Sequence, residues 1–92
     1  MQELEEYRQQ IRKINTELLH LLKKRLDVVK KIGELKKREG IPIRDIKTED
    51  RQVQELTAYG KELELDGDFV EDIFRRIIAY AVEFQKKMEN RL

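Results

Sequence analysis

Hydrophobic side chains recur along the first third of the chain in alternating steps of three and four residues. The positions in this pattern are 4, 7, 11, 14, 18, 21, 25, 28, 32 and 35, and all but Arg25 are apolar or aromatic. This spacing places them along one face of an α-helix. Since no proline interrupts it, the pattern predicts one helix from about Leu4 to Arg38, roughly 50 Å long.

A loop and two shorter helices are expected next. Gly40 suits the position after a helix C-terminus, and a proline two residues later cannot continue the helix. We expect an ordered loop over residues 40–46, because its three isoleucines favour burial. A second helix is predicted from about Thr48 to Leu63, with Asp45 or Thr48 as its N-cap.

A third helix is predicted from a capping box. Asp68 with Glu71 three residues later fits that motif and opens an amphipathic pattern that continues to about Arg91. The expected fold is therefore all-α, with three helices per chain, one long N-terminal helix, and residues 1–92 forming a single domain.

The long first helix poses a packing problem. A chain of 92 residues buries only a modest core, so much of that helix's apolar face would stay in water in a monomer. Pairing the long helices of two copies would cover it. We therefore expect an intertwined helical homodimer.

Composition and charge exclude several function classes. Twenty Lys and Arg against nineteen Asp and Glu leave a net charge of +1, so no overall field attracts nucleic acid or an anionic membrane. With no cysteine the chain lacks a thiolate nucleophile, and its single histidine, His20, argues against a histidine-based zinc site. No signal peptide or membrane-spanning run is apparent, which predicts a cytoplasmic protein without membrane contact.

Four polar residues interrupt the apolar faces. Arg25 and Lys36 lie three turns apart on the first helix, pointing nearly the same way about 16 Å apart. Glu49 begins the apolar face of the second helix, and Gln85 interrupts that of the third. Singly, each could be a snorkelling cation, a register-setting charge or a satisfied core amide. Because burying all four is costly without partners, together they predict a pocket for a small anion.

Arg8 precedes Arg25 by seventeen residues, which is about 25 Å along the helix and roughly 100° around it. It cannot reach the same small ligand within one chain, but antiparallel pairing of the long helices would bring it toward the partner's pocket. On these grounds alone, a solvated surface arginine remains the favoured interpretation.

The chain resembles the all-helical, AroQ-type chorismate mutases of the shikimate pathway. The matching elements are Arg8 with Ile11, Leu18 to Arg25, Ile32 to Lys36, Pro42 to Asp45, Glu49, and Ile77 to Gln85. Their order and separations match the family without a gap. The resemblance implies an intertwined dimer that rearranges chorismate to prephenate, in phenylalanine and tyrosine biosynthesis, with no cofactor and no metal.

The resemblance also implies catalytic roles for four residues. Arg25 and the partner subunit's Arg8 would bind the two carboxylates of chorismate. Lys36 and Gln85 would donate hydrogen bonds to the ether oxygen, on which negative charge grows as the carbon–oxygen bond breaks.

Four further residues are implied to contact the substrate. Glu49, with the backbone near Asp45, would hold the ring hydroxyl. Thr48 stands where the family often has arginine, and Ala81 where it often has serine. One carboxylate contact and one hydroxyl contact are thus expected to be missing or replaced by water.

Three alternatives stay open at this point. An isochorismate pyruvate lyase would share the fold and much of the site. A structural helical dimerisation module would use the inward charges to set its register. A non-catalytic regulatory domain would bind a pathway metabolite without turning it over.

Overall fold

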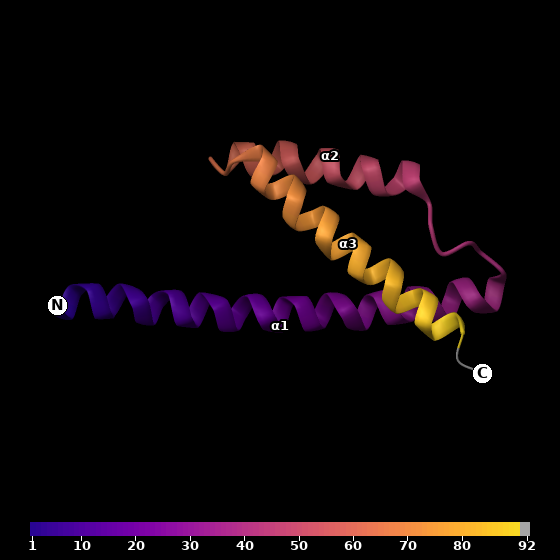
Figure 1. The fold of residues 1–92 in the computed structure, drawn as a ribbon, viewed down its shortest axis with the longest axis horizontal. Helices are drawn as coiled ribbons and strands as arrows, with labels where there is room; N and C mark the ends of the chain where they lie inside the picture. The colour runs from indigo at the N-terminus through magenta and orange to yellow at the C-terminus, as the bar shows by residue number, and fades with distance from the viewer. Residues whose placement is uncertain (91–92) are drawn as a thin grey trace.

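The computed structural model describes residues 1–90, which form three helices joined by two loops (Figure 1). Helix α1 spans Gln2–Glu39, α2 spans Ile46–Glu62, and α3 spans Gly67–Glu89. The predicted all-α fold with one long N-terminal helix is confirmed. The end predicted for the third helix, near Arg91, lies outside the described residues.

Local sequence explains where α1 ends and α2 begins. Gly40 follows α1 with φ 67° and ψ 28°, a left-handed conformation that glycine adopts without strain. Asp45 is the N-cap of α2, since its carboxylate accepts hydrogen bonds from the Thr48 hydroxyl at 2.8 Å and from the Thr48 N–H at 3.1 Å. Both bonds stabilise the ionised carboxyl and lower the pKa of Asp45.

The predicted N-cap of the third helix was wrong by two residues. Asp66, rather than Asp68, is the N-cap, and its carboxylate accepts a hydrogen bond from the Phe69 N–H at 3.1 Å. The helix begins at Gly67, so Asp68 lies within the first turn. There its negative charge faces the positive end of the helix dipole, a favourable position that needs no capping box.

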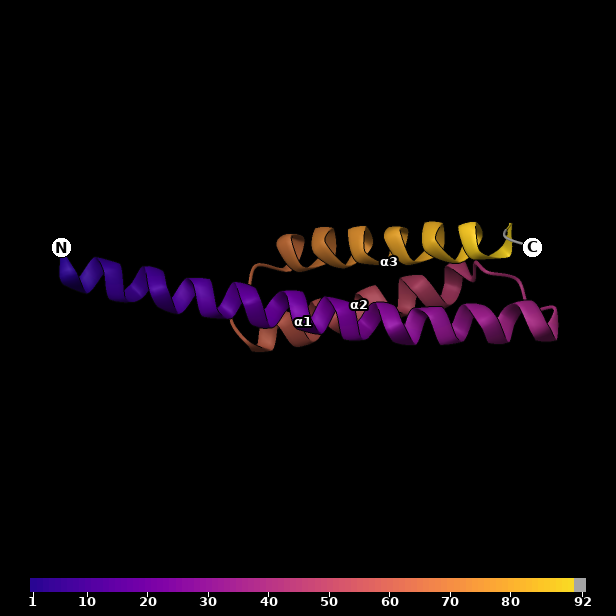
Figure 2. The same ribbon diagram turned by 90° about the horizontal axis from the view of Figure 1, so that it is seen from below.

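Helix α3 connects the structure, because it packs against both α1 and α2, whereas no Cα atom of α1 lies within 8 Å of a Cα atom of α2 in residues 1–90. The two views show α3 crossing the C-terminal half of α1, while the N-terminal half of α1 extends beyond both other helices (Figures 1 and 2). The chain is flat, with extents of 57 × 28 × 14 Å. None of the helices described is long and apolar enough to cross a membrane.

The core is small and consists mainly of valines. The buried apolar side chains are Val29, Val53, Val70, Ile78 and Val82. Close approach of α2 to α3 depends on Gly60, where a Cβ atom would lie 2.8 Å from a methyl carbon of Val70. Of the loop isoleucines expected to be buried, Ile43 packs against the core, but Ile41 and Ile46 are exposed.

The apolar face predicted for the first helix lies in solvent in the single chain. We call its exposed residues the α1 stripe: Leu4, Tyr7, Ile11, Ile14, Leu18, Leu21, Val28, Ile32 and Leu35. Each is at least 41% exposed. A compact monomer of 11.1 kDa exposes about 5,700 Å². This chain exposes 8037 Å², so it has a large apolar surface without a cover.

Candidate active site

A cavity of about 130 Å³ lies where all three helices and the loop before α2 meet. It is lined by Arg25, Ile32 and Lys36 from α1, Ile43 and Asp45 from the loop, Thr48, Glu49 and Gln52 from α2, and Ile78, Ala81, Val82 and Gln85 from α3. Seven of the eight site residues predicted from the sequence are among them. The eighth, Arg8, is not.

Arg25 is the unsatisfied cation of this cavity. Its spacing from Ile32 and Lys36, seven and eleven residues, places all three on one face of α1. The side chain is half-buried and has no hydrogen bond or ion pair with any residue in the described part of the chain. A guanidinium withdrawn from water without a partner is costly, so this geometry favours an anionic ligand beside Arg25.

Lys36 and Gln85 are both held by backbone carbonyls. The Lys36 ammonium donates to the Ile43 carbonyl at 2.7 Å, and the buried Gln85 amide donates from Nε2 to the Val29 carbonyl at 3.0 Å. Gly33 makes room, because a Cβ atom there would lie 3.2 Å from Gln85 Cγ. An ammonium has three N–H donors and an amide two, so each group retains donors for a ligand.

The acidic residues of the cavity are already engaged. Asp45 caps α2 and accepts the Thr48 hydroxyl, as described above. Glu49 is 14% exposed and forms a two-point ion pair with Arg44, from Nη2 to Oε1 at 3.0 Å and from Nε to Oε2 at 3.3 Å. This hydrogen-bonded pair raises the pKa of Arg44, and it fixes the Glu49 carboxylate at the cavity edge.

The charges that line the cavity cancel within one chain. Arg25 and Lys36 contribute two positive charges, and Asp45 and Glu49 two negative ones. Arg44 lies outside the lining and offsets Glu49. Arg8, about 25 Å from Arg25 along the continuous α1, adds nothing to the cavity of its own chain. A dianionic ligand would therefore need a further cation.

Two residues at this site, Gln52 and Arg44, gave no signal in the sequence. Gln52 lies on an exposed, polar part of α2 beside the buried Val53, where a glutamine interrupts no pattern. Arg44 lies in the loop, where its pairing with Glu49 depends on the turn into α2. Only a structure places these side chains beside the others.

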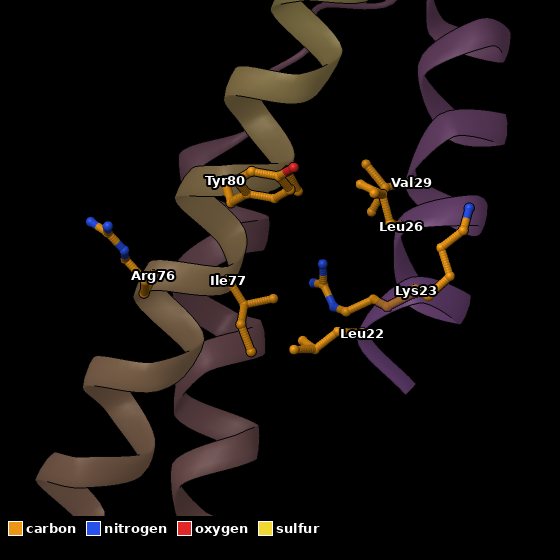
Figure 3. Close-up of a pocket in the computed structure, with 9 residues that line it drawn as sticks. Leu22, Lys23, Leu26, Val29, Arg76, Ile77 and Tyr80 are labelled. Carbon is orange, nitrogen blue, oxygen red and sulfur yellow. The ribbon is translucent and has the colours of Figure 1, made fainter. Parts of the chain in front are cut away.

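An apolar groove of about 380 Å³ adjoins the cavity (Figure 3). We call it the α1/α3 groove, and it is lined by Leu22, Lys23, Arg25, Leu26, Val29, Arg76, Ile77, Tyr80 and Ala81. In Figure 3, Leu26 and Val29 from α1 face Tyr80 from α3 across an open space. Since Arg25 and Ala81 line both hollows, the groove and the cavity adjoin at these two residues.

The fold and cavity together define an all-helical protein with a polar cavity, which is lined by two cations and an amide from the long first helix and the third helix. Comparison with known proteins gives the family. The chain belongs to the chorismate mutase type II family, whose model matches residues 7–86. The resemblance inferred from the sequence is therefore confirmed.

Similar proteins include two-function enzymes of bacteria. The chain is 35% identical over 85 residues to the bifunctional chorismate mutase/prephenate dehydratase of Buchnera aphidicola subsp. Schizaphis graminum, covering 92% of this chain and 22% of that protein. It is 39% identical over 79 residues to the T-protein of Enterobacter agglomerans, covering 83% and 20%. The Aquifex aeolicus bifunctional enzyme is 32% identical over 93 residues, covering 97% and 25%.

The chain thus spans between a fifth and a quarter of the length of these relatives. No solved structure matches it with comparable significance.

Proposed function

We propose that this chain catalyses the rearrangement of chorismate to prephenate in aromatic amino-acid biosynthesis, without a cofactor, and that residues 1–92 form one catalytic domain. The observation that carries the proposal is the half-buried, unpaired Arg25, which shares a cavity with Lys36 and Gln85. Membership of the chorismate mutase type II family supports the choice of substrate. The cytoplasmic location expected from the sequence stays a prediction.

The reaction is an intramolecular [3,3] rearrangement, so the site needs to provide only conformation and charge. Arg25 binds one carboxylate and helps to hold the substrate in the compact conformer that brings the reacting carbons together. Lys36 and Gln85 donate to the ether oxygen. Because the Ile43 and Val29 carbonyls already hold these two side chains, they stabilise the growing charge with little reorganisation.

The α2 side of the cavity binds the ring hydroxyl. Each Glu49 carboxylate oxygen has two lone pairs, so the carboxylate can accept the hydroxyl proton while it remains paired with Arg44. The rest of the cavity wall is apolar and is formed by Ile32, Ile78 and Val82. This wall lowers the local polarity, which strengthens the hydrogen bonds of Lys36 and Gln85.

We further propose that two chains form an intertwined homodimer in which Arg8 of each completes the other's site. The chain exposes roughly 2,300 Å² more than a compact monomer of its mass, or roughly 4,600 Å² for two chains, which lies within the range of total area that obligate homodimers bury. The neutral cavity supplies a second argument, because a dianionic substrate needs another cation there. The N-terminal part of α1 extends beyond α2 and α3 and is the segment available to reach a second chain (Figure 1).

Chorismate consumption followed by absorbance tests the activity. We expect wild-type protein to form prephenate, and Lys36→Ala to lower kcat/KM at least about a hundredfold, since it removes a preplaced donor. Lys30→Ala, an exposed lysine of α1 outside the cavity, is the matched control. Absence of prephenate would refute the mutase. Pyruvate release from isochorismate would then identify a lyase.

Subunit complementation tests the shared site. Arg8→Ala and Lys36→Ala chains should each be inactive as homodimers. When the two variants are refolded together in equal amounts, half of the dimers should contain one chain of each kind. Each of these mixed dimers has one intact site and one site that lacks both residues. Activity should therefore return to about a quarter of the wild-type value. If Arg8 acts within its own chain, or if no dimer forms, mixing restores nothing.

A further inference from the structure

The α2 side of the cavity has very few hydrogen-bond donors. Its polar side chains are Asp45, Thr48, Glu49 and Gln52. The two carboxylates only accept, and the Thr48 hydroxyl already donates to Asp45 at 2.8 Å. The Gln52 amide has no hydrogen-bond partner within residues 1–90. It is therefore the one uncommitted side-chain donor that this part of the described structure offers to a ligand.

The register of α2 directs Gln52 toward the site. It follows Thr48 by four residues and Glu49 by three, so the three share one face of the helix. Gln52 lies on the exposed part of this face, at the rim of the cavity. An anion held by Arg25 on α1 would face the carboxylates of Asp45 and Glu49 across the cavity. A neutral amide donor in the same cavity lining offsets that repulsion.

We propose that Gln52 is a substrate-binding residue that donates a hydrogen bond from its amide to a carboxylate of the substrate. This inference rests on the proposed function, because the dicarboxylate is the mutase substrate. The carboxylate bears the same charge in the ground state and in the transition state. The contact is therefore equally strong in both, and its loss raises KM while leaving kcat nearly unchanged.

Three variants test the proposal through steady-state kinetics. Gln52→Leu removes the donor and keeps a good helix former, so we expect KM for chorismate to rise about three- to tenfold and kcat to change less than about twofold. Gln52→Glu keeps the shape but presents a negative acceptor, and should raise KM further. Gln54→Leu alters an exposed glutamine of α2 outside the cavity and should match wild type.

Two results would overturn the role of Gln52. If Gln52→Leu has the KM of Gln54→Leu, the amide does not bind substrate. If Gln52→Glu binds chorismate as well as wild type does, the side chain accepts rather than donates. Thermal unfolding of all three variants followed by circular dichroism checks that α2 is intact.

Calorimetric titration with prephenate separates this inference from the proposed activity. Wild-type turnover with no difference between Gln52→Leu and Gln54→Leu refutes Gln52 alone. Three- to tenfold weaker prephenate binding by Gln52→Leu supports it, even if wild type shows no turnover and the mutase proposal fails. If wild type neither turns over chorismate nor binds prephenate, both are refuted.

Discussion

Gln85 is the buried polar residue of the core, and its amide is oriented by a single bond to the Val29 carbonyl. This bond uses one N–H of the amide and leaves the other for a ligand, and because Gln85 lines the cavity we place the ether oxygen of the substrate there. The proposed role of Gln85 depends on its donating a hydrogen bond. A substitution that keeps the side-chain shape but changes the donor therefore tests this role.

Gln85→Glu should make activity depend on pH. An ionised carboxylate cannot donate and would repel the ether oxygen, whereas the protonated acid donates as the amide does. Burial disfavours the ionised form, which places the pKa of the introduced acid above the ordinary value of about 4.3. We therefore expect kcat/KM of the variant to be low at pH 8 and to rise as pH falls, while wild type changes little. A flat profile for the variant would contradict the donor role.

Single residues differ in how far the sequence reveals them. Arg25, Lys36, Glu49 and Gln85 stand where an apolar residue is expected, and the energetic cost of placing them there made them visible. Gln52 lies among other polar residues on an exposed helix surface. A glutamine there has no burial penalty and interrupts no apolar pattern, so the sequence does not mark it as a site residue.

At the scale of whole elements, periodicity predicts the helices well and their first residues less well. Gly40 ends α1 as expected, because a left-handed residue is needed there. Asp66 and Asp68 are equally good caps by composition, and the pattern cannot choose between them. The connection decides: it passes through Glu64 at φ 64° and leaves Asp66 extended, so the helix begins at Gly67.

The start of α3 yields a stability prediction. Asp66→Ala should lower the free energy of unfolding by about 1 kcal/mol, because the Phe69 N–H loses its side-chain acceptor. Asp66→Asn should retain most of that stability, and Asp68→Ala should change it by less than about 0.5 kcal/mol. Urea unfolding of the three variants measures the differences. A larger loss for Asp68→Ala than for Asp66→Ala would restore the capping box inferred from the sequence.

For the whole molecule, the α1 stripe predicts that a second copy of the chain is needed. We expect wild type to have the mass of a dimer by light scattering, and Ile14→Asp, within the stripe, to give a monomer without activity. Ile46→Asp is the matched control, since Ile46 is also exposed but opens α2, where an aspartate is favourable. Monomeric wild type with full activity would exclude the shared site.

The α1 stripe also explains why seven site residues could be placed together from the sequence, whereas the position of Arg8 relative to the site could not be decided. The seven are joined by contacts within one chain, which helix periodicity and the family pattern both encode. Arg8 lies on the N-terminal part of α1, which extends beyond α2 and α3, so contacts within the chain do not predict its surroundings (Figure 1).

If a second copy covers the exposed part of the longest helix, as we propose, activity also depends on the abundance of the chain. With each site completed from a second chain, we expect assembly to be second order, so that refolding speeds up as the protein is concentrated and specific activity falls on dilution below the dissociation constant. A newly synthesised chain is then an incomplete enzyme until it meets another. The concentration of the protein in the cell would then affect the reaction rate in two ways. It sets the number of chains, and it sets the fraction of chains that are paired and have a complete site.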